Sequence, residues 1–250
     1  MLSEVLYMTS VRVRSTVDEA WNRFYDDWVT TFTEEVPGTR RGSRWRVTNG
    51  LVDGSERVPV REWPMYLATE EYARLDEFVL SRAWRKETYW EPRVRSFAPW
   101  FKDLSDYATL NLQKLDRERG DLGSVPSAVL ASTWTVDPTS LLEFQRWRTE
   151  GPEKRATHAL SHLAVHHYLA ALAQLHRYGG PSGELVIPQR HHFEDGGRLC
   201  YVSIIELEEL PTQADQTAIL ADLQAGMDEW AGVVADRQDV FAERILVVDR

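Results

Sequence analysis

The sequence predicts an α+β fold in which two successive β-α-β-β-α-β units pack together as one intramolecular α/β barrel. The second half of the chain repeats the order of strand-like and helix-like segments found in the first half, and short local motifs recur at the corresponding places. A chain of 250 residues, 43% of them apolar, is long enough for two domains and hydrophobic enough for a packed core. The fold class therefore follows from a repeated supersecondary pattern.

The first half begins with a strand over residues 6–13, in which apolar and basic residues alternate toward its end. A helix follows, and Thr16 with Glu19 three residues later is typical of a capping box at its start. The Pro37-Gly38 turn ends this helix. The remaining elements of this half are expected to be strands over residues 44–48, 65–70 and 108–115 and a helix over residues 74–84.

The second half begins with a strand over residues 129–136, followed by a helix with Asp137 as N-cap and Pro138 at its first position. Three segments then match the first half in the same order: Phe144-Gln145-Arg146-Trp147 matches Trp21-Asn22-Arg23-Phe24, residues 201–206 match 66–71, and residues 245–250 match 112–117. The boundary is expected in the polar, glycine-containing run 117–124, which divides the chain into units 1–122 and 123–250.

Each predicted unit is the ferredoxin-like motif, whose four-stranded antiparallel sheet carries its helices on one face. The other face must be covered, and two units in one chain can cover each other. Fusion also supplies within one chain a contact that separate units obtain by pairing. Both a monomer and a homo-oligomer are therefore compatible with the sequence.

Three segments of the first half resemble the dimeric α/β-barrel superfamily: Trp21-Asn22-Arg23-Phe24-Tyr25-Asp26-Asp27, Val36-Pro37-Gly38 and Arg44-Trp45-Arg46. This superfamily includes antibiotic-biosynthesis monooxygenases, muconolactone isomerases, EthD-type proteins and, in fused tandem form, chlorite dismutases. The resemblance implies a small-molecule enzyme of the cyclase, isomerase or cofactor-free oxygenase type, or a haem enzyme in the chlorite-dismutase-like case. Many members carry a histidine on the first helix, where this chain has Val29 and, in the second half, Pro152.

Composition and motifs exclude several classes of function. The net charge of −10 disfavours nucleic-acid binding, and the single Cys200 excludes cysteine-cluster metal sites. The sequence shows no signal-peptide pattern and no apolar run that could cross a membrane, so a cytoplasmic protein without a membrane partner is expected. Glycine-rich phosphate loops and nucleophile elbows are also missing. The expected partner is a small apolar or aromatic molecule.

All seven histidines lie in the second half, which makes this half the expected location of proton-transfer chemistry. Segment 157–176 is rich in alanine and leucine and is typical of a helix. In such a helix His158, His162, His166 and His176 share a face, and His167 points the opposite way. The alternative is a strand over residues 165–170, in which His166 and His167 face opposite sides of a sheet.

A second histidine pair, His191 and His192, precedes an Asp-Gly-Gly sequence that indicates a β-hairpin. The candidate catalytic residues are therefore His166, His167, His191 and His192. The expected ligand-binding residues are aromatic: Trp134, Trp147, Tyr168 and Tyr201. No metal site and no cofactor are predicted. In the haem alternative His167 or His166 ligates the iron, and in a third alternative the same pocket belongs to a non-catalytic binding protein.

Overall fold

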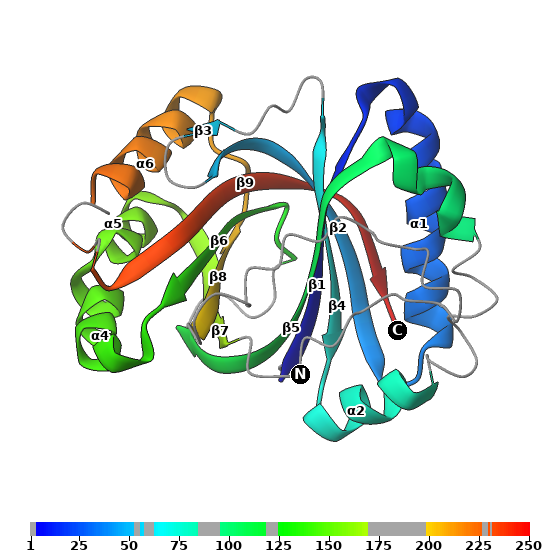
Figure 1. Cartoon of the computed structure of the whole chain (residues 1–250), viewed down its shortest axis with the longest axis horizontal. Coiled ribbons are helices and arrows are strands. Elements are labelled where there is room, and N and C mark those ends of the chain that lie inside the picture. Colours follow the sequence, from blue (N-terminus) through cyan, green and yellow to red (C-terminus); the bar gives the residue numbers. More distant parts are fainter. Residues whose placement is uncertain are drawn as a thin grey trace.

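The computed structural model describes residues 4–52, 56–57, 63–84, 96–118, 125–169, 199–226, 230 and 232–250. These residues form an α+β fold with a closed antiparallel barrel of eight strands and helices on its outside (Figure 1). The predicted α+β class and the closed barrel are thus confirmed. Helices α1 and α2 lie at one side of the barrel, and α4, α5 and α6 lie at the other (Figure 1).

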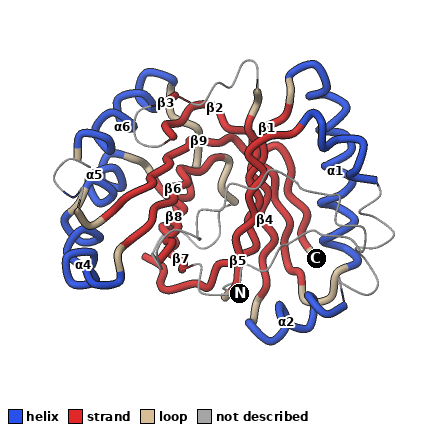
Figure 2. Tube along the Cα trace, in the orientation of Figure 1, coloured by secondary structure: helices blue, strands red, loops and turns tan. Residues whose placement is uncertain are grey.

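The barrel closes because β2 and β9 pair with each other at the two ends of the strand order β2-β4-β1-β5-β7-β8-β6-β9 (Figure 2). The short β3 pairs only with β2. The strands are β1 Val5–Val13, β2 Thr39–Val52, β3 Glu56–Arg57, β4 Met65–Tyr72, β5 Leu104–Glu118, β6 Ala128–Val136, β7 His162–Leu169, β8 Leu199–Leu207 and β9 Val234–Asp249. The helices are α1 Asp18–Glu35, α2 Leu75–Trp84, α4 Leu141–Glu150, α5 Pro152–Ala159 and α6 Gln213–Ala225.

Strand alternation divides the hydrophobic residues between the inside and the outside of the barrel. Every second residue of the long strands points into the lumen, where a cluster with members from β1, β2, β4, β5, β6, β7, β8 and β9 forms the central core. The intervening residues face the helices and form separate clusters under α1, under α4 and under α5 with α6. A strand residue that packs under a helix therefore points away from the lumen.

The predicted helix over residues 157–176 is wrong for residues 162–169, where the alternative strand interpretation is confirmed, and residues 170–176 lie outside the described residues. Helix α5 ends at Ala159, and β7 begins at His162. Strand β7 pairs with β5 on one side and β8 on the other, so hydrogen bonds on both edges override the local helix propensity of its alanines and leucines. His176 lies outside the described residues.

The two predicted helix starts differ in outcome. Thr16 lies in a 3-10 turn, Ser15–Val17, and α1 begins after Val17 without a side-chain cap, so the predicted capping box is wrong. Asp137 does cap the next turn, because its Oδ1 accepts hydrogen bonds from Thr139 N at 2.8 Å and Thr139 Oγ1 at 2.7 Å. That turn is the 3-10 helix Pro138–Ser140, and α4 follows it.

A fully buried arginine joins α1 to the sheet. Arg44 of β2 is 0% exposed and forms an ion pair with Asp26. Its Nη2 donates to Asn22 Oδ1 at 2.8 Å, and its guanidinium lies 5.0 Å from the ring centre of Tyr25. Burial is the main cause that raises the pKa of Tyr25 well above its ordinary value. The phenol therefore stays neutral beside the charged guanidinium.

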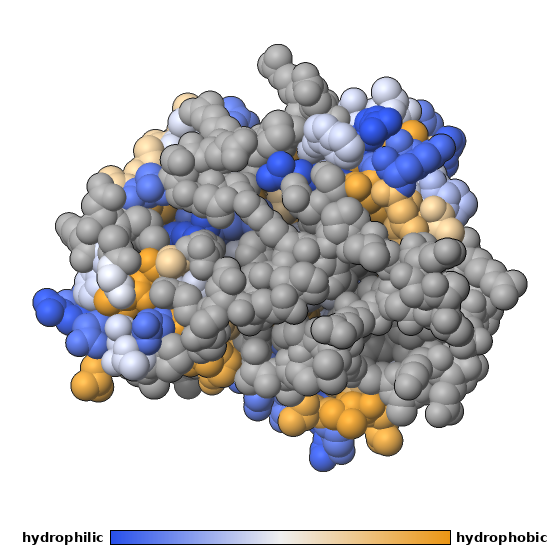
Figure 3. All heavy atoms as spheres, viewed as in Figure 1, coloured by the Kyte–Doolittle hydropathy of each residue, from blue (hydrophilic) through white to orange (hydrophobic). Residues whose placement is uncertain are grey.

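None of the helices in the described ranges is both long and apolar enough to cross a membrane. Hydrophobic residues reach the surface over α2, where Val79 and Leu80 are 56% and 70% exposed (Figure 3).

We expect Asp26→Asn to lower the free energy of unfolding by about 1.5–3 kcal/mol, because the buried Arg44 loses its charged acceptor. The matched control is Asp27→Asn, since Asp27 is exposed on the same helix and should change stability by less than about 0.5 kcal/mol. Urea unfolding of the three proteins measures both values. Equal losses in the two variants would contradict a specific role for the ion pair.

Candidate functional site

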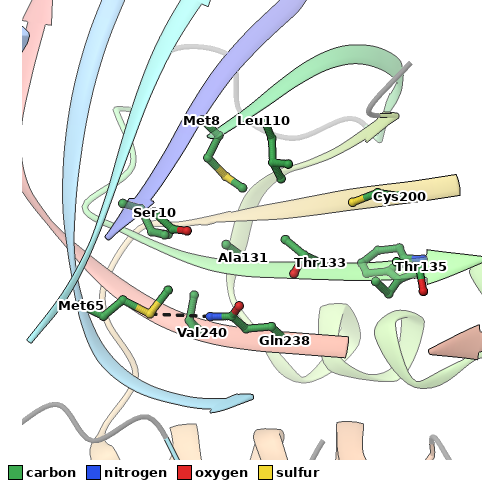
Figure 4. Close-up of a pocket in the computed structure, with 12 residues that line it drawn as sticks. Met8, Ser10, Met65, Leu110, Ala131, Thr133, Thr135, Cys200, Gln238 and Val240 are labelled. Carbon is green, nitrogen blue, oxygen red and sulfur yellow. Dashed lines mark hydrogen bonds between the residues drawn. The ribbon is translucent and has the colours of Figure 1, made fainter. Parts of the chain in front are cut away.

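Two cavities lie inside the barrel lumen among the described residues. The first has an empty volume of about 530 Å³, including space open to solvent, and lies between β1, β4, β5, β6, β8 and β9. Its walls are mainly apolar, with Ser10, Thr133, Thr135 and Gln238 as polar groups (Figure 4). Cys200, the single cysteine, also lines it as a buried free thiol.

The second cavity lies toward the opposite end of the lumen and holds the titratable groups. It has an empty volume of about 430 Å³, again including space open to solvent. Its polar lining residues are Thr69 and Glu71 of β4, His166 of β7 and Glu206 of β8. Trp45 and Tyr168 supply aromatic surface, and the rest of the lining is aliphatic. This cavity combines an apolar interior with a histidine and carboxylates.

His166 is held by a carboxylate on the neighbouring strand. The residue is 7% exposed, and its Nε2 lies 3.2 Å from Glu206 Oε1. Among the described residues, no group forms a hydrogen bond with its buried Nδ1. When Nε2 carries the proton and donates a hydrogen bond to Glu206, Nδ1 keeps a free lone pair. The geometry therefore provides a buried imidazole with one nitrogen held by Glu206 and one nitrogen that has no hydrogen-bond partner among the described residues.

Charges of both signs surround this end of the lumen. Arg41 Nε donates to Asp249 Oδ1 at 2.6 Å. Burial lowers the pKa of Arg41, but this hydrogen bond and the charges of Glu71 and Glu206 outweigh that effect and raise the pKa above its ordinary value. Arg41 therefore stays positively charged and partly compensates the carboxylates.

His167 lies on the other face of the same strand, under the helices. It is also 7% exposed. Across the sheet it is opposite Ser203, Ser203 is opposite Ser132, and Ser132 is opposite Asp239, so four polar residues form one row across β7, β8, β6 and β9. All four are buried. The row separates the apolar cluster under α4 from the cluster under α5 and α6.

One end of this polar row is a buried ion pair. Ser132 Oγ donates to Asp239 Oδ1 at 2.5 Å, and Arg237 Nε donates to the same oxygen at 2.9 Å. Arg237 is 2% exposed, and its guanidinium lies 5.6 Å from the ring centre of Trp147 and 6.0 Å from that of Trp134. The row is thus a charged, hydrogen-bonded layer inside the sheet–helix interface.

The predicted aromatic ligand-binding residues are divided between the two faces. Tyr168 lies in the second lumen cavity. Trp134, Trp147 and Tyr201 belong to the packed cluster under α4. Burial raises the pKa of Tyr201, and the charge of Arg148 only partly offsets this, so its hydroxyl stays protonated. Three of the four aromatics thus form core between sheet and helix, and Trp134 also lines the first cavity.

The other histidines are placed differently. His158 is exposed on α5, and His162 is half-buried at the start of β7, where its Nδ1 lies 3.2 Å from Leu160 O. His191 and His192 lie outside the described residues. Within the described ranges, no three His, Cys, Asp or Glu side chains converge as metal ligands would.

Sequence reasoning missed Glu206, Gln238 and the polar row. Glu206 occupies the position that matches Glu71 in the first half, so the internal repeat contained the signal that both carboxylates reach the lumen. Gln238 and Asp239 precede the final strand segment that the sequence pattern indicated. Their placement became evident only from the pairing of β9 with β6 and β2.

We expect Asp239→Asn to lower the free energy of unfolding by about 3–5 kcal/mol, because the buried Arg237 guanidinium loses its counter-charge. The control is the double variant Arg237→Met with Asp239→Leu, which removes both charges and should lose less than Asp239→Asn alone. Chemical denaturation followed by circular dichroism measures the values. A loss below about 1 kcal/mol for Asp239→Asn would show that the negative charge of Asp239 contributes little to the free energy of unfolding.

Comparison with known proteins assigns the fold and no closer relationship. No protein-family model and no curated protein matches the sequence. An anthrone oxidase-like protein superposes with a TM-score of 0.62 at 8% identity, covering 99% of this chain and 95% of that chain. A protein named "putative monooxygenase" from Fusobacterium nucleatum subsp. nucleatum gives a TM-score of 0.56 at 9% identity, covering 100% and 96%. A protein of the same name from Lactobacillus acidophilus gives 0.50 at 8%, covering 98% and 96%. The chain shares the barrel fold of these proteins.

Proposed function

We propose that this protein is an enzyme that binds a small apolar or aromatic molecule in the barrel lumen and uses His166 to move a proton. The observation that carries the proposal is the arrangement of His166 with Glu206 at 3.2 Å in a cavity with apolar walls. A histidine that is oriented by a carboxylate and faces an apolar cavity is a common arrangement for a general base. His167 lies in the polar row behind the sheet and has no part in this step.

The chemistry follows from the two nitrogens of His166. Glu206 accepts a hydrogen bond from the protonated Nε2 and so fixes the tautomer in which Nδ1 is the base. When Nδ1 takes a proton from the substrate, the negative Glu206 stabilises the imidazolium that forms. The aliphatic walls exclude water, which strengthens this electrostatic interaction. Thr69 is positioned in the same cavity to hydrogen-bond an oxygen of the substrate.

The reaction class is proton abstraction from a weakly acidic substrate, as in cyclisation, isomerisation or cofactor-free oxygenation. The fold supports this class by analogy, because structural neighbours include proteins named as monooxygenases and as anthrone oxidase-like. Anthrone is a suitable probe, since the methylene of its central ring is acidic. Its oxygenation balances as anthrone plus O₂ giving anthraquinone plus water, with no external reductant.

The architecture behind this site is, in our proposal, a fusion of two ferredoxin-like units, 1–122 and 123–250. The strand order supports it, because β2-β4-β1-β5 and β7-β8-β6-β9 place the second, third, first and fourth strand of each half in the same succession. In such a fusion one chain closes the barrel by itself. A monomer then contains the complete site. We expect this monomer in the cytoplasm, with a small molecule as its partner.

Haem is the alternative cofactor, and the described residues do not fit it. Iron ligation needs an accessible imidazole nitrogen with open space for the macrocycle. Nε2 of His166 faces Glu206 at 3.2 Å, and its Nδ1 is buried without open space for the macrocycle beside it. His167 is buried on the helix-covered face between two packed clusters. A visible spectrum of the purified protein tests this point. A Soret band that persists through dialysis would contradict the cofactor-free proposal.

We expect His166→Ala to lower kcat for anthrone oxidation by about 10²–10⁴-fold, the usual contribution of a general base. The control is His158→Ala, because His158 is exposed on α5 and should leave kcat unchanged. Glu206→Gln should cause a smaller loss, since an amide oxygen still accepts from Nε2 without its charge. Oxygen consumption and anthraquinone formation measure the rates.

A non-catalytic binding protein is the remaining alternative. It predicts that anthrone binds without being consumed, and that His166→Ala changes affinity alone. Equal kcat values in His166→Ala and His158→Ala, with both variants folded, would reject the acid–base role of His166.

A further inference from the structure

The two lumen cavities meet at a thin layer of three side chains. Met8 of β1, Leu67 of β4 and Ala131 of β6 line both cavities. The positions two residues away on these strands line one cavity or the other, so the layer crosses the middle of the lumen. Ala131 contributes only a methyl group, and Met8 is an unbranched side chain with several accessible rotamers. This partition can therefore open without a change in the backbone.

The first cavity contains polar groups whose hydrogen bonds within the described protein are weak or missing. Gln238 Nε2 donates to Met65 Sδ at 3.6 Å, and a thioether is a weak acceptor (Figure 4). Thr133, directly opposite Gln238 in the β6–β9 register, and Ser10 of β1 line the same cavity. Within the described part of the chain, neither hydroxyl forms a hydrogen bond with a protein group. An amide and two hydroxyls thus face one apolar space.

We propose that the two cavities are the ends of one binding channel, and that Gln238 with Thr133 and Ser10 anchors an oxygen at the far end of the ligand. The inference rests on the proposed function, which places the reacting end of the ligand at His166. Ser10 lies four residues along β1 from Leu6 of the second cavity, which corresponds to about 13 Å along the strand. The channel therefore favours elongated apolar molecules with a hydroxyl or carbonyl at the end that Gln238 anchors.

Three phenols test the channel by isothermal titration calorimetry: 4-ethylphenol, 4-hexylphenol and 4-(6-hydroxyhexyl)phenol. The phenol hydroxyl suits the base at His166, the hexyl chain reaches past Met8, and the terminal hydroxyl reaches Gln238. In Gln238→Leu we expect the affinity of the hydroxyl-terminated probe, relative to 4-hexylphenol, to fall by about threefold to tenfold, the value of one hydrogen bond. The ratio cancels any general change in the fold.

A second variant tests the partition independently. Ala131→Leu enlarges the central layer, so it should weaken both six-carbon probes at least tenfold more than it weakens 4-ethylphenol. Circular dichroism shows whether the variant is folded. The proposal is overturned if the probe ratio in Gln238→Leu equals that of the wild type, if Ala131→Leu affects the three phenols equally, or if none of them binds to the wild type.

Failure of the channel and failure of the proposed function give different results. Loss of turnover in His166→Ala together with an unchanged probe ratio in Gln238→Leu rejects the channel and retains the base. The expected probe ratios together with unchanged turnover in His166→Ala reject the base and retain the channel as a binding site.

Discussion

The pairing of β2 with β9 is the constraint on which the rest of the structure depends. It joins residues 41–52 to residues 238–249 and converts an open sheet into a closed barrel without free edges among the eight long strands. Closure fixes which residues face inward on every strand, because each register is now tied to two neighbours. The lumen, its two cavities and the groups that line them all follow from that one pairing.

Alternation along β7 separates two kinds of chemistry that are adjacent in the sequence. His166 faces the lumen with Glu206, and His167 faces the helices in a row with Ser203, Ser132 and Asp239. A shift of one residue in the register would exchange the two histidines. The strong pairing of β7 with both β5 and β8 prevents such a shift and gives each imidazole one fixed environment.

The helix-covered faces of the two halves each bury an arginine, and the carboxylate that pairs with it comes from a different element in each half. Under α1, Arg44 is buried and ion-paired with Asp26 from the helix. Under α4, Arg237 is buried and paired with Asp239 from its own strand. Burial of a charge is costly unless a counter-charge and hydrogen bonds accompany it. Each helix-side interface thus holds a buried charge together with its counter-charge, whereas the lumen holds His166 with Glu206 and the amide of Gln238.

The sequence by itself determined the order of the elements, the α+β class and the half that carries the histidines, because hydrophobic periodicity and repetition are local properties. It did not decide between helix and strand for residues 162–169, since the hydrogen bonds that select a strand come from β5 and β8, distant in sequence. It also did not reveal that Glu206 meets His166 or that Gln238 meets Met65. His166 and Glu206 meet because β7 and β8 pair directly, whereas Gln238 meets Met65 because closure of the barrel brings β9 next to β2 and so close to β4.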